Sequence, residues 1–187
     1  MRIQLATPAD LSEIRAVYAH GRQVQRAAHS IVWPEFTDAT ILAEVDAGNL
    51  FRIVTDAGLA GIFSVAYEDG LIWGAFERGA HIYLHRIARA PGVAGGGLVD
   101  AVLDWAEEQC ARLGREGLRL DTWANNTALI AFYERRGFRL VSERTLGADP
   151  NLAAHYHGNT FALMEKSCSA SETAGDTAGD TASGANR

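Results

Sequence analysis

The chain has 187 residues, which fits one domain with a full hydrophobic core and leaves little room for a second. Hydrophobic residues make up 48% and charged residues 21%, which is ordinary for a globular protein. The formal net charge of −6 argues against nucleic-acid binding, which requires a concentrated basic face. No apolar run approaches the roughly 20 residues of a membrane span, and the N-terminus lacks the apolar stretch of a signal peptide. We therefore expect a cytoplasmic protein.

The N-terminal quarter predicts a strand and two helices. Apolar residues alternate in a short strand over 3–5. The sequence TPAD at 7–10 is a helix start, with a hydroxyl cap, a proline at the first helical position and an acid in the first turn. This helix should run to about residue 20. An irregular segment is expected over 21–36, and a helix that Thr37 caps should end near Gly48.

The middle of the chain predicts strands. Residues 50–56, 59–67 and 71–76 read as three antiparallel strands, separated by Asp-Ala-Gly and Glu-Asp-Gly turns. A fourth strand over 81–88 should stop before Pro91, which cannot donate to a ladder. Helices and strands then alternate: a helix over 98–113, a strand at 118–120, a helix from Asn126 to Gly137, and strands at 138–143 and 158–166.

The composition changes sharply after Lys166. Ser, Ala, Thr, Gly and Asp dominate, and TAGD occurs twice in succession. Such a segment has too little apolar surface to offset its ordering entropy. We predict a folded domain over residues 1–166 and a disordered tail over 167–187. Cys110 falls in a helix and Cys168 in this tail, so neither a disulfide nor a metal site is expected from them.

A glycine-rich turn between the fourth strand and the following helix is the feature that points to chemistry. The segment HRIARAPGVAGGGL at 85–98 leads directly into a helix N-terminus. Backbone N–H groups and the positive end of the helix dipole favour phosphate or pyrophosphate there. The three glycines are not followed by Gly-Lys-Ser/Thr, which excludes a P-loop nucleotide hydrolase.

Two motifs resemble the GNAT N-acetyltransferases. Residues 84–105 align without a gap to the acetyl-CoA-binding core of that family, and LRLDTWANNTALIAFYERRGF at 118–138 is similar to its motif N-x-x-A-x-x-F-Y-x-x-x-G-F. The opening strand and helix also resemble the family, so the similarity covers roughly residues 1–166. It implies an α/β (α+β) fold with a mixed, strongly twisted β-sheet flanked by helices.

The resemblance also implies an activity. A GNAT enzyme transfers the acetyl group of acetyl-CoA, its co-substrate, to a primary amine by direct attack in a ternary complex. The acceptor would be a small molecule or a peptide amine, without nucleic acid or membrane. Whether the protein is a monomer or a homodimer stays open. The alternative is a catalytically inactive relative that binds a coenzyme or a partner, because fold alone does not guarantee chemistry.

Three residues are candidates for catalysis by this resemblance. Tyr133 matches the general acid that protonates the departing thiolate; the alternative is a tyrosine that packs beside Phe132. His85 and Asp121 are candidates for the general base because they lie on the two strands that flank the acetyl site in this family. Loss of the amine proton to water is the alternative. Asn126 should cap its helix and lie beside the coenzyme, although contact with a bound amine is the alternative.

The coenzyme would contact the fourth strand, the glycine turn and the helix of the second motif. The residues implied are Ile87, Ala88, Arg89, Ala94, Gly95, Gly96, Gly97, Leu98, Val99, Asn126, Phe132 and Tyr133. Two positions depart from the family: its Arg or Gln falls on Ala94, and its small residue falls on Val99. Losing one charge-assisted contact weakens binding about tenfold to a hundredfold. The guanidinium of Arg89 could partly compensate for the missing charge.

The acceptor pocket is harder to identify from sequence. Trp33, Trp73 and Trp123 are candidates to line it, although large aromatic residues usually lie in the core. The run from His155 to His157 precedes a closing strand and could border the pocket or form a polar loop. The sequence therefore predicts an amine acceptor without naming it.

Overall fold

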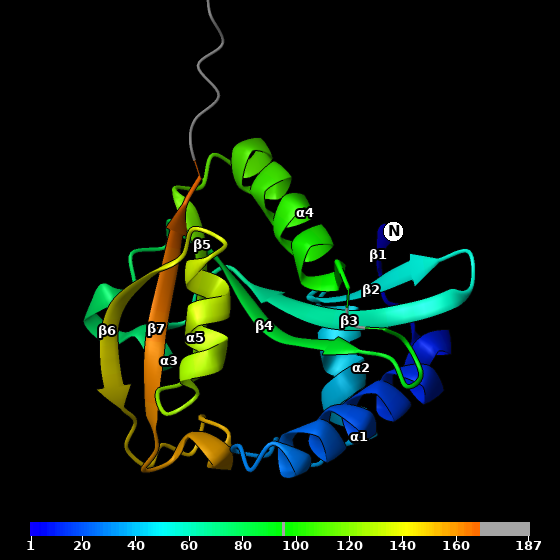
Figure 1. Ribbon diagram of the computed structural model, residues 1–187, viewed down its shortest axis with the longest axis horizontal. Coiled ribbons are helices and arrows are strands. Elements are labelled where there is room, and N and C mark those ends of the chain that lie inside the picture. The colour runs from blue at the N-terminus through cyan, green and yellow to red at the C-terminus, as the bar shows by residue number, and fades with distance from the viewer. Residues whose placement is uncertain (95, 169–187) are drawn as a thin grey trace, which may run out of the picture.

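The fold is a seven-stranded sheet with helices on both faces, seen in a computed structural model that describes residues 1–94 and 96–168 (Figure 1). The strand order is β1-β2-β3-β4-β5-β7-β6. All neighbouring strands are antiparallel except β4 and β5, so the sheet is mixed, as predicted. The strands are β1 (Arg2–Leu5), β2 (Leu50–Thr55), β3 (Gly58–Ala66), β4 (His81–Arg89), β5 (Gly117–Trp123), β6 (Arg139–Thr145) and β7 (Thr160–Ser167).

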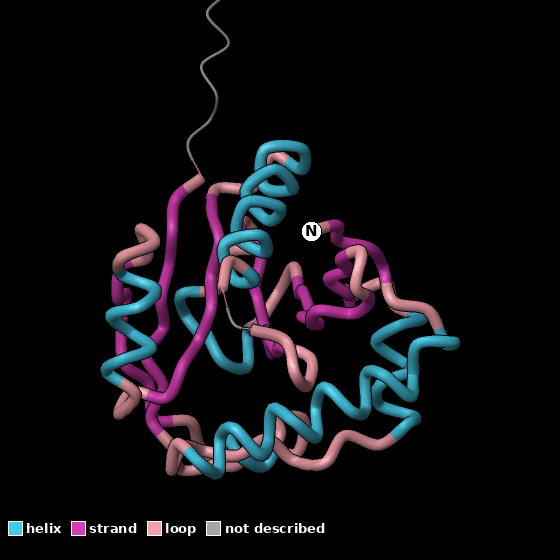
Figure 2. The backbone as a smooth tube through the Cα atoms, turned by 45° about the vertical axis from the view of Figure 1, so that its right-hand side comes forward, coloured by secondary structure: helices cyan, strands magenta, loops and turns pink. Residues whose placement is uncertain are grey.

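The helices divide between the two faces of this sheet (Figure 2). The cores under α1 and α2, and under α3, lie on one face, whereas α4 and α5 bury their apolar residues on the other. Three short 3-10 turns complete the set. The bounds are η1 (Pro8–Asp10), α1 (Leu11–Ala27), α2 (Asp38–Asp46), α3 (Gly70–Trp73), η2 (Gly74–Phe76), α4 (Leu98–Leu113), α5 (Thr127–Glu134) and η3 (Ala154–Tyr156).

Local capping explains where three of these helical segments begin. The backbone N–H of Thr7 donates to the carboxylate of Asp10 at 2.8 Å, which closes a capping box at η1. The side chain of Thr37 accepts from the N–H of Thr40 at the start of α2. The side chain of Asn126 accepts from the N–H of Leu129 at 3.1 Å and begins α5. These caps were readable from sequence.

The prediction that the first helix ends near residue 20 is wrong. α1 continues to Ala27, and the irregular segment begins only after it. Gly21 permits this arrangement because a Cβ at that position would lie 2.9 Å from the ring of Trp33. The chain after α1 turns back and packs this ring against the helix. Gly21 is therefore a packing site inside the helix.

The predicted strand over 71–76 is also wrong, because these residues form α3 and η2. Asp69 caps α3 through the N–H of Ile72, at 3.4 Å. Ile72 and Trp73 are both buried in one apolar cluster, which two consecutive residues of a strand do not achieve. Arginines from two strands then hold the segment: Arg144 donates to the carbonyl of Ile72, and Arg119 donates to the carbonyl of Phe76 at 2.8 Å.

The folded region extends past the predicted boundary at residue 166. β7 includes Ser167, and the backbone N–H of Cys168 donates to the carbonyl of Glu116 at 3.0 Å. Cys168 also packs against the apolar cluster that contains Cys110. Placing Cys168 in a polar tail was therefore wrong. The predicted disorder beyond this residue lies outside the described residues.

β4 and β5 separate near the middle of the sheet, and this separation positions the site. The two strands pair only between residues 81–83 and 117–119. The register of β3 against β4 shifts between Ile62 and Ser64, and Arg86 has a positive φ of 51°. A bulge of this kind bends a strand and re-aims its side chains. The parallel pair thus opens into a space between its two strands.

Candidate active site

The cavity of about 810 Å³ begins where β4 and β5 separate. Residues of both strands line it, together with α1, α5, the 28–36 segment that follows α1, and the 149–157 segment between β6 and β7. Residues of both sequence motifs, 84–105 and 118–138, therefore line the same cavity. His85, Asp121 and Tyr133 all line this cavity.

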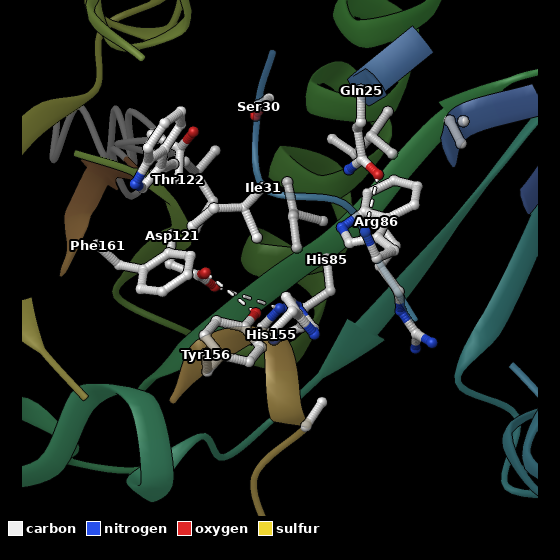
Figure 3. A pocket seen from close by; sticks show the side chains of 18 of the residues that line it. Gln25, Ser30, Ile31, His85, Arg86, Asp121, Thr122, His155, Tyr156 and Phe161 are labelled. Atoms are coloured by element: carbon white, nitrogen blue, oxygen red, sulfur yellow. Dashed lines mark hydrogen bonds and ion pairs between the residues drawn. The ribbon is translucent and has the colours of Figure 1, made fainter. Parts of the chain in front are cut away.

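His85 lies between the carboxylates of Asp69 and Asp121, and Figure 3 shows it beside Asp121. Its Nδ1 is 3.5 Å from Oδ1 of Asp121, and its Nε2 is 3.4 Å from Oδ2 of Asp69. The hydroxyl of Tyr156 donates to the other oxygen of Asp121 at 3.1 Å. The side chains of Asp121 and His85 are only 6% and 17% exposed, so solvent screens this ion-pair cluster weakly.

The surroundings of His85 set its charge. Burial by itself would lower the pKa of the imidazole, but Asp121 and Asp69 outweigh burial and raise the pKa to about 9. At neutral pH the ring is therefore an imidazolium between two carboxylates. With both carboxylates ionised, the cluster carries a net charge of −1 and attracts a cation. Burial and the nearby Asp121 raise the pKa of Tyr156 well above its ordinary value, so its hydroxyl remains a donor.

The same three side chains have the composition of a metal site. One ligand atom from each of Asp69, His85 and Asp121 lies within 4.8 Å of the others. A metal ion requires a neutral imidazole, and therefore competes with the proton that His85 holds. A compact cation with its own hydrogen-bond donors fits the protonated cluster better.

Tyr133 reaches the cavity from α5. Its side chain is buried, with ring centroids of Phe132 and Phe138 at 5.3 and 5.5 Å. Burial raises the pKa of Tyr133 to about 12, so the phenol is protonated across the physiological range. The arrangement is compatible with both interpretations of the sequence, because Tyr133 packs against aromatic rings and also lines the cavity.

The predicted coenzyme residues cluster beside this cavity. Ile87, Ala88, Arg89 and Asn126 line it. Leu98 is buried at the start of α4, and Val99 packs partly buried against the same apolar cluster. Phe132 packs beneath a guanidinium, with Cζ of Arg136 3.6 Å from its ring centroid. Arg136 in turn pairs with Asp100 in the first turn of α4.

The glycine turn is open to a ligand. Ala94, Gly96 and Gly97 are exposed, and Gly97 has a φ of 73°, which favours glycine. Gly95 lies outside the described residues. The first N–H groups of α4 have no carbonyl within the helix to accept them, so the turn fits a pyrophosphate. Arg89 donates to the carbonyl of Val93 at 3.0 Å, which brings its guanidinium to this turn.

Only some of the aromatic and histidine candidates for the acceptor pocket line the cavity. Trp33 and Trp123 line the cavity, whereas Trp73 is fully buried with the guanidinium of Arg119 4.3 Å from its ring. His155 lines the cavity together with Tyr156. Burial lowers the pKa of His155 to about 4, so this ring is neutral. His157 contacts the carbonyls of Asp149 and Leu152 instead and holds its own turn together.

Three charged residues at the cavity were missed by sequence reasoning. Asp69 reads as part of an ordinary turn, although it both caps α3 and contacts His85. Arg86 and Glu44 form an ion pair between β4 and α2 that no local pattern indicates. Successive side chains of a regular strand point to opposite faces, so Arg86 would lie on the face opposite to His85. Only the bulge brings both side chains to one cavity.

The comparison with known proteins decides the family. The sequence profile of the Acetyltransferase (GNAT) family matches residues 19–138, well over half of the chain. The chain belongs to the GNAT acetyltransferase family. It is 33% identical over 134 residues to the uncharacterized N-acetyltransferase YesJ of Bacillus subtilis (strain 168), covering 70% of this chain and 67% of YesJ.

Solved structures agree on the GNAT fold. An acetyltransferase of this family from Listeria monocytogenes 4b F2365 superimposes with a TM-score of 0.68 and 22% identity, over 89% of this chain and 94% of that one. A GNAT phosphinothricin acetyltransferase from Sinorhizobium meliloti, solved with acetyl-CoA, gives a TM-score of 0.62 and 17% identity, over 89% and 88%.

This GNAT protein is accordingly an N-acetyltransferase with acetyl-CoA as its co-substrate and an amine as its acceptor. Among the residues that the structure describes, no helix has both the length and the apolar character to cross a membrane.

Proposed function

We propose that the enzyme transfers the acetyl group by direct attack of a primary amine in a ternary complex, within the cavity between β4 and β5. The observation that carries this proposal is the placement of a carboxylate-bound histidine and a protonated tyrosine on the walls of one cavity. These side chains are suited to remove a proton from the amine and to supply a proton to the leaving group.

The coenzyme would lie along the cavity face of β4 and end at the N-terminus of α4. The backbone of residues 87–89 would hold its acyl and amide groups, and the exposed turn at Ala94, Gly96 and Gly97 would hold its pyrophosphate. Arg89 would supply a positive charge at this turn, in place of the side chain that Ala94 lacks. Acetyl-CoA contributes an activated thioester; the remaining chemistry belongs to the protein.

His85 and Asp121 would prepare the amine. Since an amine arrives as an ammonium ion, the carboxylates of the His85 cluster attract it. The ammonium and the imidazolium repel each other, so binding lowers the pKa of both groups and favours loss of the histidine proton to solvent. His85 then accepts the amine proton, while Asp121 orients the ring.

Tyr133 would act on the other side of the reaction. The amine nitrogen forms its bond to the acetyl carbon while the bond from that carbon to sulfur breaks. The electron pair of that bond leaves on sulfur as a thiolate. An ordinary thiol has a pKa of about 8.5. The hydroxyl of Tyr133 donates its proton to this sulfur and is restored from solvent.

Two measurements on the purified protein test this function. Calorimetric titration should show that acetyl-CoA binds with a submillimolar dissociation constant. Its affinity should be lower than in a family member that has a basic residue at the position of Ala94. Release of free thiol from acetyl-CoA should then depend on an added amine, with the acetylated amine detected by mass spectrometry. Coenzyme binding without amine-dependent thiol release, across a broad panel of small and peptide amines, would contradict the proposal.

A further inference from the structure

Consecutive residues of β4 face the cavity and bind different carboxylates. His85 contacts Asp69 and Asp121, whereas Arg86 donates to Glu44. Figure 3 shows the two side chains leaving neighbouring positions and diverging. The positive φ of Arg86 makes this possible, because the bulge re-aims its side chain. The cavity therefore has two charged ends, one at His85 and one at Arg86.

Each end presents a buried carboxylate oxygen that makes no hydrogen bond of ordinary geometry among the described residues. Oε2 of Glu44 and Oδ2 of Asp69 are both buried, and neither has a hydrogen-bond partner among the described residues; Oδ2 of Asp69 has only the longer ion-pair contact with His85. A carboxylate oxygen can only accept, so Oε2 of Glu44 requires a donor from elsewhere, whereas Oδ2 of Asp69 faces the protonated Nε2 of His85 and can accept from a second donor. Leaving such atoms unsatisfied is costly, and native proteins rarely do so without a ligand or water. Both residues line the cavity, so a ligand with donors at two points would satisfy them.

The net charge at the His85 end favours a cation, whereas the Arg86 end is neutral overall. Arg86 and Glu44 neutralise each other, and Ser64 accepts a further hydrogen bond from the same guanidinium at 2.9 Å. The cluster around His85 retains a net charge of −1, and the neutral His155 does not offset it. A carboxylate on the ligand would compete with Glu44 for Arg86. Amines without an acidic group are therefore the best match.

Two segments that line the cavity, 28–36 and 149–157, lie side by side (Figures 1 and 2). Ile31 of the 28–36 segment packs into the apolar cluster that contains Leu152 of the 149–157 segment. The first segment is fixed where the N–H of Trp33 donates to Gln25 at 2.9 Å. The second is fixed by the contacts of His157 with backbone carbonyls. Walls of this kind suit a compact molecule better than a polypeptide that must pass through.

We propose that the acceptor is a small aliphatic diamine. One amine is acetylated beside His85 and Asp121, and the second, protonated amine is held by Glu44. This inference rests on the proposed function, because it assigns the substrate class of the same cavity. The hydrogen bond to Glu44 is charge-assisted, which is worth about tenfold to a hundredfold in affinity.

Three acceptors of equal chain length test the proposal: putrescine, n-butylamine and γ-aminobutyrate. Each has four carbons, and the far end is an aminomethyl, a methyl or a carboxylate group. In the wild type, kcat/KM for putrescine should exceed that for n-butylamine by about tenfold or more, with γ-aminobutyrate the poorest of the three. Equal values for putrescine and n-butylamine, or a preference for γ-aminobutyrate, would overturn the proposal.

The matched variants are Glu44→Gln and Asp46→Asn. Glutamine keeps an acceptor for Arg86 but removes the charge that would bind the second amine. The ratio of putrescine to n-butylamine should therefore collapse to within about threefold. Asp46→Asn removes the same charge from an exposed position of α2 and should keep the wild-type ratio. A retained ratio in a folded Glu44→Gln variant would show that Glu44 does not bind the amine.

Direct calorimetry separates this inference from the proposed function. If acetyl-CoA binds and peptide amines are acetylated while putrescine neither binds nor reacts, the diamine assignment is wrong and the acetyl transfer stands. If putrescine binds more tightly than n-butylamine but acetyl-CoA does not bind, the acceptor site stands and the proposed function fails.

Discussion

At the scale of single residues, the charge of His85 is the decisive property of the site. Asp69 and Asp121 keep the imidazole protonated at neutral pH, whereas a general base must be deprotonated to act. In the proposed mechanism, the free enzyme therefore holds a proton on the group that would have to receive one. This arrangement suits a cationic substrate, whose arrival helps to expel the stored proton.

The first prediction concerns pH. For the wild type, kcat/KM should rise with pH to about 9, as free His85 loses its proton. Asp69→Asn removes one of the two carboxylates and keeps a residue able to cap α3. The rising limb should then move to lower pH, measured as the apparent pKa of the kcat/KM profile. The titration of the amine substrate is the same for both enzymes, so an unshifted limb would mean that His85 is not the base.

The second prediction concerns Tyr133. Tyr133→Phe keeps the ring between Phe132 and Phe138 but removes the proton donor. If proton transfer to sulfur is part of the rate-limiting step, kcat should fall about 10²-fold, with Tm and acetyl-CoA affinity nearly unchanged. Tyr67→Phe, outside the cavity, is the matched control. Wild-type kcat in the Tyr133→Phe variant, with chemistry shown to be rate-limiting, would make Tyr133 a packing residue only.

At the scale of elements, short segments between strands supply much of the acceptor site. α3 and η2 hold Asp69 in place, and arginines on two strands bind the carbonyls of these turns. The backbone N–H of Asp69 also donates to Glu77 at 2.7 Å. In the proposed mechanism the turn before α4 would play the equivalent part for the coenzyme, but its side chains are small and uncharged.

The third prediction follows from that turn. Ala94 is exposed directly before the glycines, so Ala94→Arg should bring a guanidinium to the pyrophosphate and tighten acetyl-CoA binding about tenfold. Ala111→Arg adds the same charge near the other end of α4 and should leave the dissociation constant unchanged. Both constants are measured by calorimetry. Equal affinity of the wild type and a folded Ala94→Arg variant would place the pyrophosphate elsewhere.

At the scale of the whole molecule, two partly buried histidines, His85 and His155, have opposite effects on how stability changes with pH. The pKa of His85 is raised from 6.5 to about 9 in the folded state, so its contribution is complete below pH 6.5 and is lost as pH rises through 9. The pKa of His155 is lowered from 6.5 to about 4. The folded state therefore resists its protonation, and stability falls as pH drops from 6.5 toward 4.

The fourth prediction is a maximum of Tm near pH 6.5. His85→Gln should remove the decline between pH 6.5 and 9, and His155→Gln should reduce the decline on the acid side. A loss of about 1 kcal/mol lowers Tm by about 2–4 °C in a domain of this size, so calorimetric scans resolve each limb. An alkaline decline of equal size in wild type and His85→Gln would assign that limb to other groups.

The sequence by itself determined the elements whose signals are local. Caps at Thr7, Thr37 and Asn126 start helices where the pattern predicted them, and apolar spacing marked β4 and α4. The family motifs indicated the mixed sheet and the acetyltransferase activity, because they couple a strand, a glycine turn and a helix N-terminus within a short stretch of chain.

Only the tertiary structure decided what depends on contacts between distant segments. α3 and η2 form where a strand was predicted, because Ile72 and Trp73 are both buried in one apolar cluster. Two arginines from distant strands also donate to backbone carbonyls of this segment. The sequence suggested His85 and Asp121 separately, but their approach to 3.5 Å, and the addition of Asp69, depend on how β4 and β5 separate. A pKa is fixed by the charges and burial around a group, and most of the charges around His85 lie far from it along the chain.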